Sequence, residues 1–422
     1  MLLHSASQLI TVAGPPQQGV KLGDLGIIEN GAVLVRDGLI EMVGNSDDLQ
    51  RRYKDEKMIS AEHCAVLPGF VDPHTHLVWA GDRAAEFEMR LEGKSYLEIM
   101  AAGGGIQSTV NATRAADKEM LFDQALKRAH TMFAYGTTTA EAKSGYGLDF
   151  ETERKQLQVA MDLHKAGPME IVPTFLGAHM VPKEYRDNPG GYVDLLCNHI
   201  LVDIKSWWET AYPNEKQPFV DVFCEKGAFD IHQSRQILEA ASSLGFPLKM
   251  HADEFENLGG AALAVSLGAV SVDHLVKTSK SDIAMMASSQ TMAVSLPCTP
   301  FGLSETEYTP AKEMINAGCT LALASDLNPG TAWCGNMQFV IALSCRYMKM
   351  TPAQAIAAAT INAAAAIERD DRIGSIETGK QADMIILSSS DYRQLPYRFG
   401  MNQVRTVIKK GVVYEREAYA DA

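Results

Sequence analysis

Cysteine is sparse and unpatterned in this 422-residue chain. The seven cysteines are scattered and form no CxxC pair, which excludes a disulfide framework and favours free thiols in a reducing cytosol. Long apolar runs are also missing, because no segment approaches the roughly 18 uninterrupted residues of a membrane span. No basic segment or small-residue cleavage site accompanies the apolar start MLLHSASQLI. We therefore expect a cytoplasmic protein with no membrane partner.

Positive charge is in deficit. The chain has 38 Lys and Arg against 52 Asp and Glu, which gives a formal net charge of −14. Nucleic acids and anionic membranes both require basic patches, so we expect neither as a partner. The hydrophobic content of 46% is enough for a large core. This length suggests two or three domains, although an α/β barrel can use about 250 residues alone.

Eight apolar runs alternate with helical patterns in the middle of the chain. Most of these runs are nearly continuous in Val, Leu, Ile and Ala, which is typical of parallel strands buried on both faces. The stretches between them include FETERKQLQVAMDLHK and GGAALAVSLG, which have helical patterns. The alternation predicts an α/β fold, a (β/α)8 TIM-like barrel. The runs begin at Ala65, Gly136, Glu170, Phe219, Pro247, Ala269, Thr291 and Thr320.

Both chain ends show short strand patterns instead. GAVLVRDGLIEMVG near the start contains an Asp-Gly turn signal, and GKQADMIILSS and VRTVIKKGVVYE near the end give further short strands. Two β-rich ends that flank a barrel most simply meet in one small β-sandwich domain. The predicted division assigns residues 1–64 and 366–422 to the sandwich and residues 65–365 to the barrel.

Two segments outside the strands carry local signals. Thr351, Pro352 and Gln354 fit the N-cap, first helical residue and capping-box partner of a helix. The run Gly103-Gly104-Gly105 lacks the preceding strand and following Lys-Ser/Thr of a phosphate-binding loop. We interpret it as a hinge beside the barrel mouth, with residues 84–106 as the expected lid.

The stretch FVDPHTHLVWAGDR places two histidines one residue apart directly after an apolar run. Residues i and i+2 of a strand share a face, so His74 and His76 are expected to point to one spot. The C-terminal strand ends carry the chemistry of a barrel, and His251 and Asp326 fall at such ends. Three imidazoles and a carboxylate suit zinc or iron(II), with one position open to water or substrate. The sequence predicts one divalent ion per chain.

Further polar residues fall at the same strand ends. Glu254 suits a general acid, although a glutamate at a helix N-terminus gives the same pattern. His274 suits the stabilisation of an oxyanion, and Asp273 is expected to point the other way. Asp326 can also take the proton of attacking water. Lys143 raises the alternative of two metals bridged by a carboxylated lysine, but that lysine is expected on the fourth strand, so one metal is favoured.

With these residues in place, the chain resembles the amidohydrolase superfamily over essentially its whole length. The HxH motif, the histidines of strands five and six, and the aspartate of strand eight match its metal-site pattern. Within the superfamily, the motifs resemble those of a histidine-degrading hydrolase that acts on a cyclic amide C–N bond. The resemblance implies a small-molecule substrate, 4-imidazolone-5-propanoate, and the product N-formimidoyl-L-glutamate. The motifs are HTHLVWAGDRAAEFEMR, KSGYGL, FLGAH, HADEF, VDHL and SDLNPGTAWCGNM.

The resemblance implies a role for each matching residue. The implied metal ligands are His74, His76, His251 and Asp326. The implied catalytic residues are Glu254, His274 and Asp326. The implied substrate contacts are Arg83, Tyr146, His179, Glu254, Asn328, Gly330 and Thr331. A carboxylate tail needs a cation, which Arg83 can supply as a bidentate clamp. A surface role is the commoner fate of such an arginine, so this assignment depends on the resemblance.

Two other functions stay open at this point. A metal-dependent deaminase of an aminated heterocycle would use the same scaffold with less need of an arginine clamp, and it would release ammonia. A non-catalytic relative that serves as a scaffold would tend to lose ligands, whereas the full set is present here. Zinc and iron both fit the ligands, and a homodimer is an option because barrel enzymes of this kind often dimerise.

Overall fold

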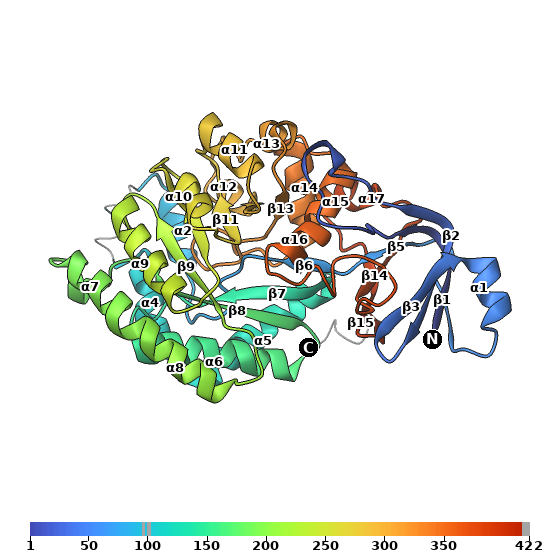
Figure 1. Ribbon diagram of the computed structural model, residues 1–422, viewed down its shortest axis with the longest axis horizontal. Coiled ribbons are helices and arrows are strands. Elements are labelled where there is room, and N and C mark those ends of the chain that lie inside the picture. Colours follow the sequence, from blue (N-terminus) through green and yellow to red (C-terminus); the bar gives the residue numbers. More distant parts are fainter. Residues whose placement is uncertain (95–97, 99–102, 416–422) are drawn as a thin grey trace.

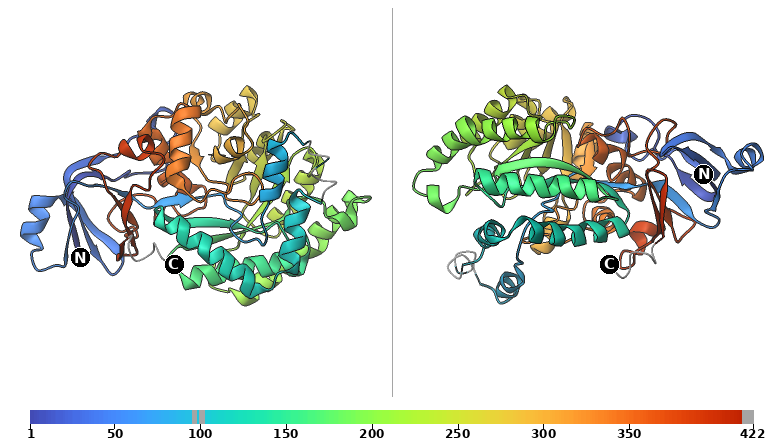
Figure 2. Two further views of the ribbon diagram at one scale, coloured as in Figure 1. Left: turned by 180° about the vertical axis from the view of Figure 1, so that it is seen from behind. Right: turned by 90° about the horizontal axis from the view of Figure 1, so that it is seen from below.

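The computed structural model describes residues 1–94, 98 and 103–415 of the chain. These residues form a barrel and, beside it, a smaller domain in which the first strands of the chain lie next to the last ones (Figures 1 and 2). Among the described residues, no helix has the length and apolar character needed to cross a membrane.

Eight parallel strands form the barrel, and all eight fall within the predicted runs. Each strand pairs with the next from first to last. The first and last strands meet just beyond their ends, where Thr75 and Leu327 form a parallel bridge. The predicted (β/α)8 fold is therefore confirmed. The strands are β6 (Phe70–Asp72), β7 (Thr137–Lys143), β8 (Glu170–Ala178), β9 (Phe219–Cys224), β10 (Lys249–Ala252), β11 (Ser271–His274), β12 (Met292–Ser295) and β13 (Leu321–Leu323).

Helices separate the strands and surround the barrel (Figure 1). The connection from β6 to β7 is long and holds α2 (Ala84–Leu91), α4 (Ile106–Ala115) and α5 (Lys118–Ala134). The helices that follow are α6 (Phe150–Ala166), α7 (Pro189–Leu195), α8 (Leu201–Ala211), α9 (Ile231–Ser243), α10 (Gly260–Ser266), α11 (Lys280–Ala287), α12 (Cys298–Gly302), α13 (Ala311–Ala317) and α14 (Met337–Tyr347). Of the predicted lid, residues 95–97 and 99–102 lie outside the described residues.

One end of the barrel interior is apolar and closed by a short helix. Thr351 caps α15 (Pro352–Ala358) and forms the predicted capping box with Gln354. The next helix, α16 (Ile361–Ala365), packs its alanines against Val71, Val172 and Phe219.

The two chain ends meet in one smaller domain, as predicted for the β-sandwich, and their strands form one mixed sheet of eight strands. The turn Asp37-Gly38 has φ values of 50° and 78°, the positive values that a tight hairpin turn requires. Strands from both ends share one apolar core that includes Leu3, Val33 and Met384. The strands are β1 (Leu2–Ile10), β2 (Ile27–Arg36), β3 (Leu39–Asn45), β4 (Met58–Ser60), β5 (Ala65–Pro68), β14 (Met384–Leu387), β15 (Val404–Lys409) and β16 (Val412–Glu415).

The first predicted run is not a single strand. It divides at Gly69 into β5, which pairs with β1 and β14, and β6, which pairs with β7. A Cβ atom at Gly69 would lie 2.3 Å from Cγ2 of Thr138, so only glycine fits this crossing between the two sheets. The crossing leads the chain from the smaller domain directly into the strand that precedes the HxH motif.

Candidate active site

Six of the predicted functional residues lie at or just beyond the C-terminal ends of barrel strands. This placement follows from short apolar strands that end where polar residues begin. His251 lies on β10 and His274 is the last residue of β11. His74 and His76 follow β6, His179 follows β8 and Asp326 follows β13.

The HxH pair converges on Asp326, as the sequence predicts. Nε2 of His74 and Nε2 of His76 each lie 3.4 Å from Oδ1 of Asp326. The ligand atoms of these three residues all lie within 4.8 Å of one another. The backbone supports the arrangement, because the Asp326 N–H donates to the His74 carbonyl at 3.1 Å.

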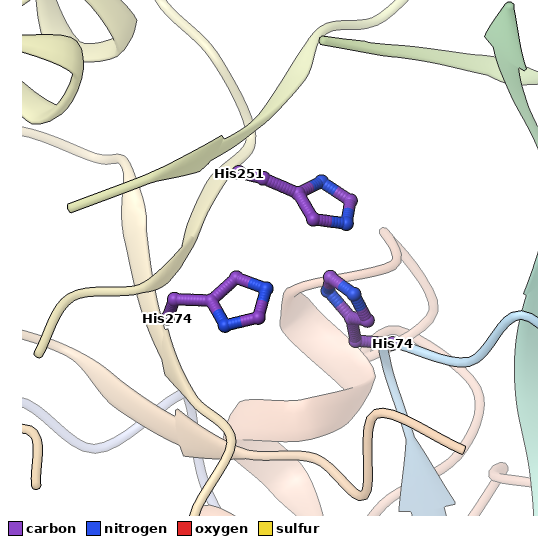
Figure 3. A group of neighbouring side chains, drawn as sticks. All are labelled: His74, His251 and His274. Atoms are coloured by element: carbon purple, nitrogen blue, oxygen red, sulfur yellow. The ribbon is translucent and has the colours of Figure 1, made fainter. Parts of the chain in front are cut away.

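His251 and His274 complete the cluster around His74. Figure 3 shows the three imidazoles pointing toward one another from different strands. The ring centroids of His74 and His251 lie 4.4 Å apart, and one ring nitrogen from each of the three residues lies within 4.8 Å of the others. All of these side chains are buried. The geometry brings together every predicted metal ligand and adds His274 to their neighbourhood.

Several lone pairs in this cluster have no partner among the described residues. Nε2 of His74, Nε2 of His251 and Oδ1 of Asp326 are buried and accept no hydrogen bond. Burial lowers the pKa of His251 and of His76, which keeps both imidazoles neutral. Burial and the charge of Lys143 lower the pKa of His74, but its contacts with Asp273 and Asp326 raise it overall, so a bound ion would compete with a proton there. Imidazole and carboxylate lone pairs of this kind are the donor set that a divalent ion requires. The residues therefore fit a metal ion.

Carboxylates behind the cluster contact two of its histidines. Nδ1 of His74 lies 2.6 Å from Oδ2 of Asp273, so the Nδ1–H donates there and Nε2 stays available. Nδ1 of His251 lies 3.0 Å from Oδ2 of Asp221. The expectation that Asp273 points the other way is wrong, because the strand alternation places Asp273 inside the barrel. Sequence reasoning also missed Asp221, although a lone aspartate in the apolar run FVDVFC is a usable signal.

Lys143 does not have the environment of a carboxylated lysine. Its side chain is fully buried, and Nζ lies 2.6 Å from Asp221 and 2.9 Å from Glu141. Burial lowers the pKa of Lys143, but the charges of Asp221, Glu141 and Asp273 raise it above its usual value. These contacts require an ammonium group rather than a carbamate, so the residue does not support the two-metal alternative.

Glu254 stands at the edge of the cluster. Its Oε2 lies 3.6 Å from Nε2 of His274, and its side chain is 9% exposed. Burial, together with the negative charges of Asp326 and Glu225, raises the pKa of Glu254 well above its usual range. Burial also lowers the pKa of His274 to about 4. The raised pKa favours a protonated Glu254 carboxyl, and the lowered pKa of His274 favours a neutral imidazole beside it.

A pocket opens directly above the cluster and is lined by most of the predicted substrate contacts. His179 stacks on His76 with ring centroids 5.0 Å apart, and its Nδ1 lies 3.0 Å from the Gly145 carbonyl. Burial lowers the pKa of His179 to about 3, so its imidazole is neutral. The predicted residues that line the pocket are His76, Arg83, Tyr146, His179, His251, Glu254, His274, Asp326, Asn328 and Thr331.

Arg83 reaches this pocket with one edge of its guanidinium already paired. Nε and Nη2 both lie 2.8 Å from Oε2 of Glu86, a partner that sequence reasoning missed. Nη1 faces Gly330, where an added Cβ would lie 2.1 Å from it. Arg90 of α2 donates to the Gly330 carbonyl at 3.0 Å. The loop after β13 is thus held against the helix that carries these two arginines.

Asn328 organises that loop. Its Oδ1 accepts hydrogen bonds from the backbone N–H groups of Gly330 and Thr331, both at 2.8 Å. Its Nδ2 donates to the Asp326 carbonyl at 2.8 Å. The N–H group of Gly330, an implied substrate contact, already has a partner within the loop.

Comparison with known proteins places the chain in a class. Residues 229–414 match the amidohydrolase family. The barrel resembles that of a zinc-bound adenosine deaminase from Xanthomonas campestris, with a TM-score of 0.73, 19% identity and coverage of 99% and 93% of the two chains. It also resembles E. coli guanine deaminase, with a TM-score of 0.71, 15% identity and coverage of 98% and 99%. At these identities the likeness concerns the fold alone.

Relatives with higher sequence identity define the family of the chain more narrowly. An imidazolonepropionase from Herpetosiphon aurantiacus is 49% identical over 100% of this chain and 98% of its own length. One from Parabacteroides distasonis is 48% identical over 98% of both chains, and one from Geobacillus kaustophilus is 45% identical over 98% and 97%. The chain belongs to the imidazolonepropionase family.

Proposed function

We propose that this protein hydrolyses the cyclic amide C–N bond of 4-imidazolone-5-propanoate and releases N-formimidoyl-L-glutamate, a step of histidine degradation. The supporting observation is the full-length similarity to imidazolonepropionases at up to 49% identity, with the predicted ligands converging beneath one pocket. The deaminases share the fold at much lower identity, and no observation on the site favours that activity.

In this proposal His74, His76, His251 and Asp326 hold one divalent ion, either zinc or iron. Such an ion, when bound, supplies Lewis-acid chemistry and lowers the pKa of water toward about 7. The unpartnered lone pairs of three of these residues support the assignment.

The proton transfers then fall to three side chains. Asp326 accepts a proton from the attacking water as the new C–O bond forms at the ring carbonyl. The neutral His274 stabilises the developing oxyanion as a hydrogen-bond donor. Glu254, whose raised pKa favours the protonated form, gives its proton to the ring nitrogen as the C–N bond breaks. That nitrogen becomes part of the formimidoyl group, and the hydroxyl of the added water ends in the new carboxyl group. The proton taken up by Asp326 then returns to Glu254, directly or through solvent, which closes the cycle.

The pocket wall supplies recognition. Arg83, with Nη1 directed to the loop after β13, binds the propanoate tail, and Tyr146 and His179 contact the ring or the tail. Burial raises the pKa of Tyr146 above its usual value, so its hydroxyl remains a donor. Asn328 and Thr331 line the pocket, and the hydrogen bonds of Asn328 to the backbone of Gly330 and Thr331 fix the shape of that loop.

The remaining assignments are coarser. We propose residues 1–64 and 366–422 as one domain and 65–365 as the other, although β5 pairs within the smaller sheet. We propose a homodimer in the cytoplasm. The net charge of −14 supports the absence of nucleic-acid and anionic-membrane partners. The cysteines are all free, which suits a reducing compartment.

The test is an assay of the purified protein on imidazolone propanoate made freshly from urocanate. Loss of the ring's ultraviolet absorbance is followed with metal-loaded and chelator-treated protein side by side, and ammonia is measured in parallel. Metal-dependent loss well above the spontaneous rate, without ammonia, is expected. No acceleration by metal-loaded protein would overturn the substrate assignment, and ammonia release from an aminated heterocycle would favour a deaminase.

A further inference from the structure

Lys143 lies beneath the candidate active site at the C-terminal end of β7, and neither the metal ligands nor the pocket includes it. Its side chain is 0% exposed, and Nζ reaches three buried carboxylates. The distances are 2.6 Å to Asp221, 2.9 Å to Glu141 and 3.6 Å to Asp273. A lysine is almost never buried to this extent without such partners.

Two of these carboxylates also contact predicted metal ligands. Oδ2 of Asp221 lies 3.0 Å from Nδ1 of His251, and Oδ2 of Asp273 lies 2.6 Å from Nδ1 of His74. In each case it is the Oδ2 atom that faces both the lysine and the imidazole. One ammonium group therefore joins the supports of two histidines that come from different strands.

A second buried lysine provides an internal comparison. Nζ of Lys249 lies 2.9 Å from Glu141 and 3.0 Å from the carbonyl of Pro73, and its side chain is also 0% exposed. It carries the same charge in the same layer. Its hydrogen bonds go to Glu141 and Pro73 rather than to the carboxylates that contact the histidines.

We propose that Lys143 is a positioning residue that holds Asp221 and Asp273 so that Nε2 of His251 and Nε2 of His74 face the metal ion. The inference deepens the proposed function and rests on it. Outer partners of this kind fix the tautomer and the ring orientation of metal-ligating histidines.

Substitution of Lys143 can change the affinity for the metal ion in two ways, through the loss of its charge or through the loss of its positioning role. The two predict changes of affinity in opposite directions. A buried ammonium group repels a nearby cation, so removal of its charge alone should tighten metal binding. Loss of positioning should weaken it instead, because Asp221 and Asp273 would repel each other and turn away from the imidazoles. Substitution of Lys249 removes the same charge but leaves the direct contacts of Lys143 with Asp221 and Asp273 in place.

The experiment compares wild type, K143M and K249M as full-length proteins. The affinity for Co²⁺ is measured by competition with a chromophoric chelator, and the visible spectrum of the bound Co²⁺ reports the coordination geometry. K143M is expected to bind Co²⁺ about 10- to 100-fold more weakly, with an altered spectrum. K249M should keep the wild-type spectrum and bind as tightly as wild type or more tightly.

Three outcomes overturn the proposal: wild-type affinity in K143M, tighter binding in K143M, or equal weakening in both variants. If K143M does not fold, the double variant E141Q/K143M removes one charge of each sign and is compared with E141Q by the same criteria. If the wild type binds Co²⁺ and hydrolyses the substrate, and K143M binds Co²⁺ with the wild-type affinity, this inference is wrong and the proposed function stands. A wild type that binds no ion would overturn the proposed function and this inference with it.

Discussion

Nδ1 of His74 lies 2.6 Å from Oδ2 of Asp273, although the two residues are 199 positions apart in the chain. Both side chains are fully buried. The contact fixes the proton on Nδ1 and directs the other ring nitrogen toward His251 and Asp326. A carboxylate outside the ligand set therefore determines how a ligand is presented.

The substitution D273N should weaken metal binding by about 10- to 100-fold, because an amide no longer favours a single His74 tautomer. Metal content after dialysis against a chelator and kcat/KM would both fall. D383N is the matched control, since Asp383 is also buried and pairs with Lys409 at 2.7 Å in a separate cluster. Retention of the metal by D273N to the same extent as by D383N would contradict the expectation.

E254Q tests the proton donor. Glutamine keeps the size of the side chain but has no acidic proton, so kcat should fall by about 100-fold or more while metal binding persists. Metal content and the steady-state rate are measured on the same preparation. Full activity in E254Q with bound metal would show that another group protonates the ring nitrogen.

The pH dependence of kcat follows from the same residue. Burial and the charges of Asp326 and Glu225 raise the pKa of Glu254, so its acidic form persists to a higher pH than that of an exposed glutamate. Activity that needs this form is present below the raised pKa and is lost as the pH rises through it. The wild-type rate should therefore fall on the alkaline side. The residual rate of E254Q should not fall on the alkaline side. If kcat falls in the same way in both proteins, the titrating group is not Glu254.

G330A should raise KM without loss of the fold. An added Cβ would lie 2.1 Å from Nη1 and 2.9 Å from Cζ of Arg83, so the guanidinium must move. Loss of one charge-assisted hydrogen bond to the propanoate tail costs about 1.5–3 kcal/mol, or roughly tenfold or more in KM. The control is G190A, because a Cβ at Gly190 would meet nothing within 4 Å. Equal KM values in the two variants would remove Arg83 from the proposed recognition of the tail.

His164 provides a test of stability away from the pocket. Burial lowers its pKa, and its Nδ1 accepts a hydrogen bond from the Ile171 N–H at 3.2 Å, which requires the neutral ring. In the unfolded chain His164 has its ordinary pKa of about 6.5 and takes up a proton more readily than in the folded protein. The free energy of unfolding that His164 contributes above pH 6.5 should therefore be lost as the pH falls through its lowered pKa in the folded state. Urea unfolding at pH 7.5 and 5.5 should show a smaller loss for H164Q than for wild type. Equal losses would exclude this residue as a source.

Much of the fold could be predicted because strand and helix periods are local. Continuous apolar runs mark strands buried on both faces, and the HxH spacing places His74 and His76 together before any contact is known. The rule that barrel chemistry lies at strand ends then brings in His251 and Asp326. The division of the first run at Gly69 could not be predicted in this way, since it depends on a side chain from another strand.

The supporting charges were harder to predict. Asp221, Asp273 and Lys143 acquire their roles through contacts between different strands, which no single spacing reveals. A signal existed in Lys249 and His251, which lie two residues apart on one strand and so share its inner face. The pairing of Arg83 with Glu86 is a neighbouring i, i+3 contact, and the resemblance alone gave no reason to look for it.

The bridge between Thr75 and Leu327 has a consequence for synthesis on the ribosome. The segments that carry His74 and Asp326 come from the first and last strands of the barrel and exchange backbone hydrogen bonds only after both exist. A nascent chain that lacks β13 therefore has no complete set of ligands. We expect the ion to bind only after β13 has been synthesised and has closed the barrel against β6. The free energy of ion binding then stabilises the closed barrel relative to folding intermediates in which it is still open.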